Sequence, residues 1–140
     1  MWMMAAEKTI KVLIIDDSES IRLSLHRFLN VFRDLEWVGE SSNGSEVLME
    51  CARLSPDVVL IDVALPHVDV AQITRTIRHH FPGTQVIGTV GFEEQAVIEP
   101  ILEAGAIRCI SKMQNIYLIA DAVRQAARTS DSQHLVDRTG

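Results

Sequence analysis

The sequence predicts an α/β fold, a five-stranded parallel doubly wound sheet of flavodoxin-like topology with helices on both faces. Strand-like and helix-like patterns alternate five times along the chain, and this alternation calls for a parallel sheet with right-handed crossovers. Charged residues follow several predicted strands, at the edge where open α/β sheets bind ligands. Periodicity does not give the strand order, but five units of this length favour an order in which the first and third strands are adjacent.

The first half of the chain predicts two strands and two helices. The apolar run Lys11–Ile15 is typical of a strand buried on both faces, and it leads directly into Asp16 and Asp17. A helix follows, with Ser18 or Ser20 as its N-cap. Its inward residues are expected to be Ile21, Leu25, Phe28, Leu29 and Phe32. A short strand over Glu36–Glu40 and a turn over residues 41–44 precede a second helix. The residues that this helix directs inward are expected to be Val47, Leu48, Cys51 and Leu54.

The second half predicts three more strands, each followed by a helix. The strand Asp57–Asp62 ends in a carboxylate, and the next helix ends at Pro82 and Gly83. That helix is expected to direct Val70, Ile73, Ile77 and Phe81 inward. The strand Gln85–Val90 precedes a helical segment from Glu94 to Ala104 that contains Pro100, so this helix is either kinked or begins late. The strand Ile107–Ile110 leads to Lys112, and a last helix runs from Asn115 to about Ala127.

Length and composition are those of one globular domain. The chain has 140 residues, of which 47% are hydrophobic and 23% charged, and its net charge of −6 argues against unaided binding of nucleic acid. No apolar run approaches a membrane span, and Cys51 and Cys109 fall in apolar segments that suit reduced thiols. We expect a cytoplasmic protein with no membrane contact. The domain is expected over residues 9–128, with a flexible N-terminus over 1–8 and a tail or the start of a linker over 129–140.

Four charged residues stand at the predicted carboxyl ends of strands: Asp16, Asp17, Asp62 and Lys112. Adjacent carboxylates repel each other unless a positive charge lies beside them, and Mg²⁺ prefers oxygen ligands of this kind. A carboxylate beside such an ion can act as a nucleophile toward a phosphoryl group, and an ammonium can pair with a phosphoryl oxygen. Each residue also has a simpler interpretation. The acid pair or Asp62 could cap the segment that follows, and an isolated lysine is most often solvated. Together, the four residues favour an active site.

The chain resembles the response-regulator receiver domains of bacterial two-component systems, and is most similar to receivers that precede a helix-turn-helix output domain. The resemblance rests on five motifs, which are Val12–Asp17, Pro56–Asp62, Leu65-Pro66, Glu103–Ala106 and Ile110–Lys112. It implies that Asp62 accepts a phosphoryl group from a sensor histidine kinase or a phosphotransfer protein. Asp17, Asp62 and the backbone carbonyl of Ala64 would hold Mg²⁺, with Asp16 acting through water, and Lys112 would contact the phosphoryl group. A receiver assists only its own phosphorylation and dephosphorylation, so we expect no enzyme with a diffusible substrate.

The sequence departs from the receiver pattern at the residues that usually sense phosphorylation. Receivers carry Thr or Ser at the end of the fourth strand, but the ungapped count places Val90 there, and Thr89 lies one residue too early to reach the site unless a bulge realigns it. Cys109 occupies the position of the usual aromatic residue, and His67 and Val70 replace usual glycines. We therefore expect intact phosphoacceptor chemistry with an altered switch formed by Val90, Thr89 and Cys109.

Two other functions compete with this interpretation. A phosphorylation-independent interaction module would keep the receiver fold and use its altered fourth helix and fifth strand for docking. A phosphohydrolase with Asp62 as nucleophile is poorly supported, because Ala64 stands where a general acid would be needed. A DNA-binding output domain outside these residues and a homodimer are further expectations, whereas this domain itself is not expected to bind nucleic acid.

Overall fold

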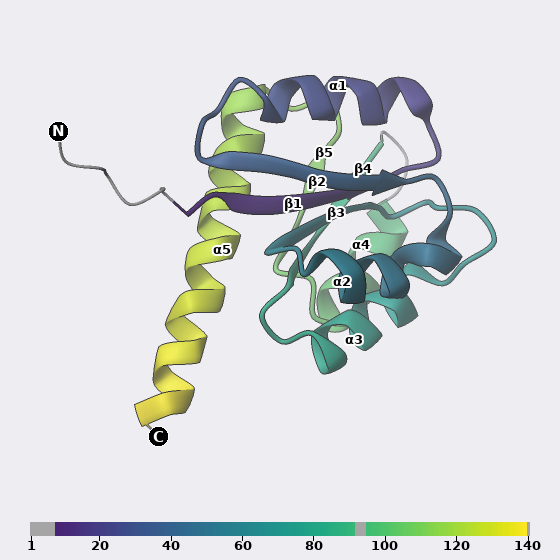
Figure 1. The fold of residues 1–140 in the computed structure, drawn as a ribbon. Coiled ribbons are helices and arrows are strands. Elements are labelled where there is room, and N and C mark those ends of the chain that lie inside the picture. The colour runs from purple at the N-terminus through teal and green to yellow at the C-terminus, as the bar shows by residue number, and fades with distance from the viewer. Residues whose placement is uncertain (1–7, 92–94, 140) are drawn as a thin grey trace, which may run out of the picture.

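The computed structural model of the protein describes residues 8–91 and 95–139, with side chains up to residue 130. Its five strands form one parallel sheet in the order β2-β1-β3-β4-β5 (Figure 1). The strands are β1 Ile10–Ile15, β2 Leu35–Ser41, β3 Val58–Asp62, β4 Gln85–Val90 and β5 Arg108–Ser111. The helices are α1 Glu19–Leu29, η1 Gly44–Glu46 (a 3₁₀ turn), α2 Val47–Leu54, α3 Val70–His80, α4 Gln95–Glu103 and α5 Ile116–Thr139. The predicted fold class and the adjacency of the first and third strands are confirmed.

Two helical layers bury the two faces of the sheet, which explains the unbroken apolar run of β1. Val12 and Ile14 face the layer formed by α1 and α5, where Leu25 and Val123 meet them. Leu13 and Ile15 face the other layer. That layer is formed by α2, α3 and α4, through Val47, Cys51, Val70, Ile77 and Ile101. Because side chains alternate along a strand, a central strand covered on both sides has no polar position in its interior.

The structure shows where the first helix begins and ends, and it corrects one prediction for the second helix. Ser18, not Ser20, is the N-cap of α1, because its hydroxyl accepts a hydrogen bond from the amide of Ile21 at 3.3 Å. The helix ends at Leu29, so the apolar Phe32 packs against the core from the following connection. The prediction that Leu48 points inward is wrong, since 37% of it is exposed. It follows the buried Val47 directly, and adjacent helical residues point about 100° apart.

The fourth helix begins at Gln95 and contains Pro100 in its interior. The alternative in which the helix starts late with Pro100 in its first turn is therefore wrong, and Glu94 lies outside the described residues. Since proline has no amide hydrogen, the helix lacks one backbone hydrogen bond at this position. The buried Ile101 anchors this helix in the core beside it.

The fifth helix is longer than the sequence pattern suggests. It continues to Thr139 rather than ending near Ala127, and its last turns extend past the sheet (Figure 1). The predicted aperiodic tail over residues 129–139 is therefore helical, while its role as a linker stays a prediction. Apolar periodicity reports only the part of a helix that packs, and extending an existing helix requires no new nucleation. Among the described residues, no helix combines the length and apolar character needed to cross a bilayer.

Gly88, in the middle of β4, leaves room for neighbouring side chains. A β-carbon at this position would lie 2.8 Å from Cγ1 of Val63 and 2.9 Å from Sγ of Cys109. The half-buried thiol of Cys109 thus fills space next to a residue that has no side chain. Gly88 of β4 and Cys109 of β5 are therefore complementary in shape.

We expect Gly88→Ala to lower the free energy of unfolding by about 1–3 kcal/mol, because the added methyl group overpacks this contact. Urea denaturation measures the loss. Gly83→Ala is the matched control, since nothing lies within 4 Å of a β-carbon there, and it should be close to neutral. Adding Cys109→Ala to Gly88→Ala should recover part of the loss, because it removes the sulfur atom. A double variant no more stable than Gly88→Ala would contradict this packing argument.

Candidate functional site

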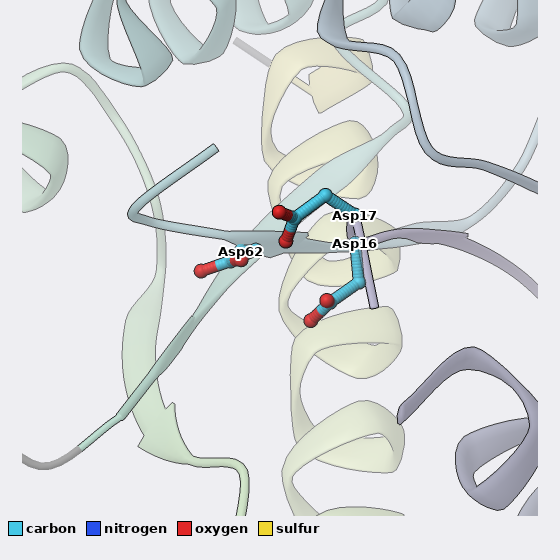
Figure 2. Close-up of side chains that lie close together, drawn as sticks. All are labelled: Asp16, Asp17 and Asp62. Carbon is cyan, nitrogen blue, oxygen red and sulfur yellow. The ribbon is translucent and has the colours of Figure 1, made fainter. Parts of the chain in front are cut away.

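Three carboxylates meet at the carboxyl edge of the sheet. Asp16 and Asp17 follow β1, and Asp62 ends β3, which is the neighbour of β1. One carboxylate oxygen from each residue lies within 4.8 Å of the other two. Figure 2 shows the three side chains projecting from these two strand ends into one region. The convergence that the sequence predicted for these residues is confirmed.

Backbone hydrogen bonds continue the sheet ladders past the ends of the strands and hold the backbone of the site residues in place. The amide of Asp16 donates to the carbonyl of Ser41 on β2 at 3.1 Å. The amide of Lys112 donates to the carbonyl of Val90 on β4 at 3.0 Å, and the amide of Val63 donates to the carbonyl of Thr89 at 3.0 Å. The site residues therefore sit on a hydrogen-bonded frame instead of on independent loops.

The ammonium of Lys112 lies between two buried carboxylates. Its Nζ is 2.9 Å from Oδ2 of Asp16 and 3.0 Å from Oδ2 of Asp62. Asp16 is 1% exposed and Asp62 is 3% exposed, so both charges are largely withdrawn from water. Lys112 reaches them from the end of β5, two strands away from β3. The simpler interpretation of Lys112 as a solvated lysine is therefore wrong.

The carboxylates also accept hydrogen bonds from nearby backbone amides. Oδ1 of Asp16 accepts from the amide of Ser18 at 2.9 Å, and Oδ1 of Asp62 accepts from the amide of Ala64 at 2.9 Å. Because Ser18 itself caps α1, the interpretation of the acid pair as the helix cap is wrong. Asp62 does engage the backbone of the following loop, so its local role coexists with the ion pair.

A divalent cation fits this donor set. Within the described residues, the buried Oδ2 of Asp16 accepts no hydrogen bond, although Lys112 lies at ion-pair distance from it. Asp17 is exposed beside it. Asp16 and Asp17 therefore have carboxylate oxygens that can coordinate an ion, and Asp62 lies next to them. Mg²⁺ sites are built from carboxylates of this kind. Lys112 supplies one positive charge against three negative ones, so an added cation would relieve the remaining repulsion.

The pKa shifts agree with this charge balance. Burial raises the pKa of Asp62, and the neighbouring Asp16 raises it further, while the Ala64 amide and Lys112 oppose the shift without cancelling it. Burial alone would lower the pKa of Lys112, but its close pairing with the carboxylates of Asp16 and Asp62 raises it instead. Lys112 is thus charged at neutral pH, and the ionised form of Asp62 is the costly one in the folded protein.

The predicted switch residues lie beside this site on β4 and β5. Val90 packs in the core layer of α2 to α4, whereas Thr89 is paired in register with Asp62 and with Ile110, which belongs to the opposite layer. The expected separation of Val90 and Thr89 on two faces is confirmed. However, Thr89 lies nearer to Asp62 than its sequence position suggested. No hydrogen bond among the described residues joins the Thr89 hydroxyl to Asp62, and Cys109 is half-buried over Gly88.

His67 lies in the loop that follows Asp62 and is exposed. Its φ angle is 67°, in the left-handed region that glycine adopts without strain. This conformation explains why a glycine is usual at this position of receivers.

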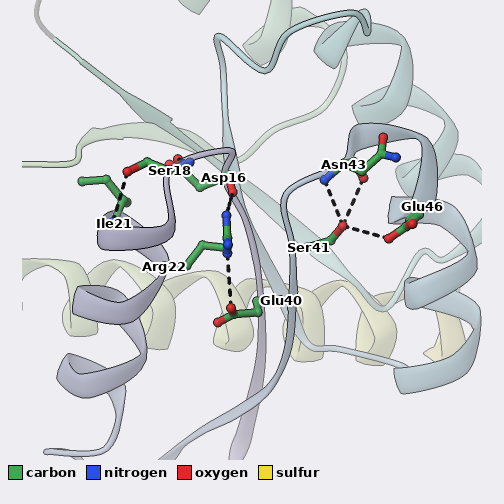
Figure 3. A network of polar contacts seen from close by, with 8 residues as sticks. All are labelled: Asp16, Ser18, Ile21, Arg22, Glu40, Ser41, Asn43 and Glu46. Carbon is green, nitrogen blue, oxygen red and sulfur yellow. Dashed lines mark hydrogen bonds and ion pairs between the residues drawn. The ribbon is translucent and has the colours of Figure 1, made fainter.

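One polar residue near the site was missed in the sequence. Arg22 of α1 donates from Nη1 to the backbone carbonyl of Asp16 at 2.7 Å and pairs with Glu40 of β2 (Figure 3). A signal was present in the sequence, since Arg22 lies in the first turn of the helix, where the helix dipole disfavours a cation. A positive charge at that position requires another interaction to stabilise it.

Comparisons with known proteins agree with this geometry. A sequence profile of the response regulator receiver domain matches residues 12–124. The transcriptional regulatory protein LiaR of Bacillus subtilis strain 168 is 36% identical over 119 residues, which cover 85% of this chain and 56% of LiaR. The response regulator protein VraR of Staphylococcus aureus is 34% identical over 120 residues, or 86% of this chain and 57% of VraR. The chain thus spans little more than half the length of these relatives.

Solved structures give the same result. The signal receiver domain of NarL from Mycobacterium tuberculosis superposes with a TM-score of 0.81 at 27% identity, covering 87% of this chain and 98% of that domain. The response regulator domain of Thermotoga maritima CheB gives a TM-score of 0.76 at 25% identity, covering 86% and 98%. With the profile matching most of the chain and the acids gathered at the strand ends, the protein belongs to the response regulator receiver domain family of two-component systems.

Proposed function

We propose that this receiver domain accepts a phosphoryl group on Asp62 from a sensor histidine kinase or a phosphotransfer protein, with Mg²⁺ as cofactor. The observation that carries the proposal is the ammonium of Lys112, which lies within 3.0 Å of both buried carboxylates, with Asp17 beside them. An interaction module without phosphorylation has no need for three carboxylates held together and partly neutralised in this way. The repulsion between them costs stability unless the site has a use for it.

Each residue has a role that follows from its position. A carboxylate oxygen of Asp62 forms a bond to phosphorus while the bond between phosphorus and the donor imidazole nitrogen breaks. The ammonium of Lys112, already 3.0 Å from Asp62, then pairs with a phosphoryl oxygen and balances the charge that arrives there. Asp17, Asp62 and the backbone carbonyl of Ala64 would hold Mg²⁺, with Asp16 acting through water. The ion supplies neutralisation of phosphoryl oxygen charge when bound.

We further infer an output domain outside these residues. The curated relatives LiaR and VraR are a transcriptional regulatory protein and a response regulator protein, and this chain matches little more than half of each. The net charge of −6 argues against DNA binding by the receiver itself, since DNA binding relies on basic residues. DNA contact therefore belongs to a second domain, which phosphorylation of Asp62 would control.

Mg²⁺ should bind the wild-type protein and stabilise it, by about 1.4 kcal/mol at a concentration ten times the Kd. Thermal unfolding with increasing MgCl₂, against EDTA, measures the gain. Because the pKa of Asp62 is raised, protons compete with Mg²⁺, and the affinity should begin to fall at a higher pH than for an ordinary aspartate. Asp62→Asn is the control and should lose the stabilisation. A variant that gains as much as the wild type would contradict the site.

Incubation with acetyl phosphate and Mg²⁺ should add one phosphoryl group to the wild type and none to Asp62→Asn, as measured by intact-protein mass spectrometry. Lys112→Gln should slow the modification about tenfold or more, because it removes the charge that pairs with the phosphoryl oxygen. EDTA should prevent the reaction. A folded wild type that stays unmodified would support the phosphorylation-independent interaction module instead.

Val90→Thr should enlarge the conformational response to phosphorylation. A threonine hydroxyl at this position can donate a hydrogen bond to the phosphoryl group in the phosphorylated state alone, and this difference shifts the equilibrium between the two conformations of the domain. Amide hydrogen exchange over β4, α4 and β5, with and without acetyl phosphate, measures the response. Thr89→Val is the matched control at the neighbouring position and should leave the wild-type response unchanged. A response that Thr89→Val removes would show that Thr89 supplies the hydroxyl, against this prediction.

A further inference from the structure

Arg22 connects the acid pair to the neighbouring strand through two contacts. Its Nη1 donates to the backbone carbonyl of Asp16 at 2.7 Å, and its Nε lies 3.2 Å from Oε1 of Glu40 on β2 (Figure 3). The side chain is 14% exposed, so most of the guanidinium is withdrawn from water. Its two bonds have different directions and use two nitrogens of one rigid planar group. Arg22 therefore holds the Asp16 carbonyl from a fixed point between α1 and β2.

With this contact, every polar group of the Asp16 backbone and one of its carboxylate oxygens is held. The amide donates to Ser41, the carbonyl accepts from Arg22, and Oδ1 accepts from the amide of Ser18. Only Oδ2 is left to face Lys112 and the other carboxylates. Asp16 is thus fixed in one orientation by groups from two segments, the end of β2 and the start of α1.

The Asp16 carbonyl matters because it belongs to the peptide group that leads to Asp17. A peptide group is planar, so a bond that fixes its carbonyl also fixes the direction in which the chain enters Asp17. Among the described residues, no hydrogen bond or ion pair holds the exposed carboxylate of Asp17 itself. Its position is therefore set by its backbone, which the Arg22 bond restrains on one side and the bond between the Ser18 amide and Oδ1 of Asp16 restrains on the other.

The charge of Arg22 alone does not favour a cation site. A guanidinium near the carboxylates repels a divalent cation, and its pairing with Glu40 only reduces that repulsion. Two consequences of Arg22 therefore have opposite signs. Its charge opposes cation binding, whereas its hydrogen bond to the Asp16 carbonyl orders a ligand for the cation. An experiment on affinity can separate them.

We propose that Arg22 is a positioning residue, which holds the Asp16–Asp17 peptide so that the Asp17 carboxylate faces Asp62 and is ready for a divalent cation. This inference rests on the proposed Mg²⁺-dependent function. It assigns the first turn of α1 to the cation site in addition to its place in the core. The loss of such a supporting contact typically weakens metal binding by about tenfold or more.

The test measures the Kd for Mg²⁺ by isothermal titration calorimetry on the wild type, Arg22→Gln and Arg22→Lys. We expect Arg22→Gln to bind Mg²⁺ about tenfold more weakly although it removes a repelling charge. Arg22→Lys should recover part of the affinity, because an ammonium can still donate to the carbonyl but cannot bond Glu40 with the same planar geometry. An unchanged or smaller Kd in Arg22→Gln would overturn the inference and show that charge repulsion dominates.

Two controls separate this role from a general loss of stability. Arg124→Gln breaks a comparable pair, in which Arg124 of α5 bonds both carboxylate oxygens of Asp34 at 2.6 and 3.0 Å. Asp34 precedes β2, at the end of the sheet opposite to Asp16, Asp17 and Asp62. Arg124→Gln should change thermal stability in EDTA without changing the Kd, and a weaker Kd in this variant would contradict a specific role for Arg22. If Arg22→Gln does not fold, Arg22→Ala, which also removes the donor to the Asp16 carbonyl, is measured in its place, and wild-type affinity in it overturns the inference. A wild type that binds no Mg²⁺ would overturn the proposed function itself.

Discussion

Two ionised carboxylates buried at one end of a sheet repel each other unless a cation stands between them, and the order of the strands in this structure meets that constraint. The Nζ of Lys112 lies within 3.0 Å of both Asp16 and Asp62, and each of the three residues comes from the end of a different strand. Their strands must therefore be held in one order and one register, with β1 beside β3 and β5 two places from β3. The single lysine leaves the three acids with excess negative charge, which a divalent cation would offset.

The sheet and the first helix hold the charged residues of the site in position. Hydrogen bonds from Asp16, Val63 and Lys112 continue the sheet ladders beyond the strands, so the charged groups keep the precision of the sheet. On the α1 side, Ser18 caps the helix and also contacts Asp16, while Arg22 bonds the Asp16 carbonyl. The two apolar layers fix the helices against the sheet and thereby fix these contacts. The site therefore depends on the core, since displacement of α1 from its layer would break the contacts of Ser18 and Arg22 with Asp16.

The charged residues of the site match the usual receiver pattern, whereas the neighbouring residues on β4 and β5 that would respond to phosphorylation do not. Under the proposed function, Asp62 would accept the phosphoryl group and Lys112, 3.0 Å away, would pair with it. Val90 offers no hydroxyl, and the thiol of Cys109 fills the space next to Gly88. Thr89 stands in register with Asp62, on the face of the sheet opposite to Val90, and among the described residues no hydrogen bond joins its hydroxyl to Asp62. Under the proposed function, a response to phosphorylation would therefore use contacts other than those usual in receivers.

The sequence by itself determined the fold class, the central strands and the four charged residues of the site, because those features depend on local patterns. Alternation buries β1 and β3 on both sides, and parallel strands bring Asp16, Asp17, Asp62 and Lys112 to one edge whatever the loops do. The tertiary structure alone decided that Ser18 caps α1, that Leu48 is exposed, that Pro100 lies inside α4 and that α5 continues to Thr139. It also revealed Arg22, whose partners are a backbone carbonyl and a residue on another strand. Contacts of this kind depend on distances between segments remote in the chain, and no periodicity along the sequence records them.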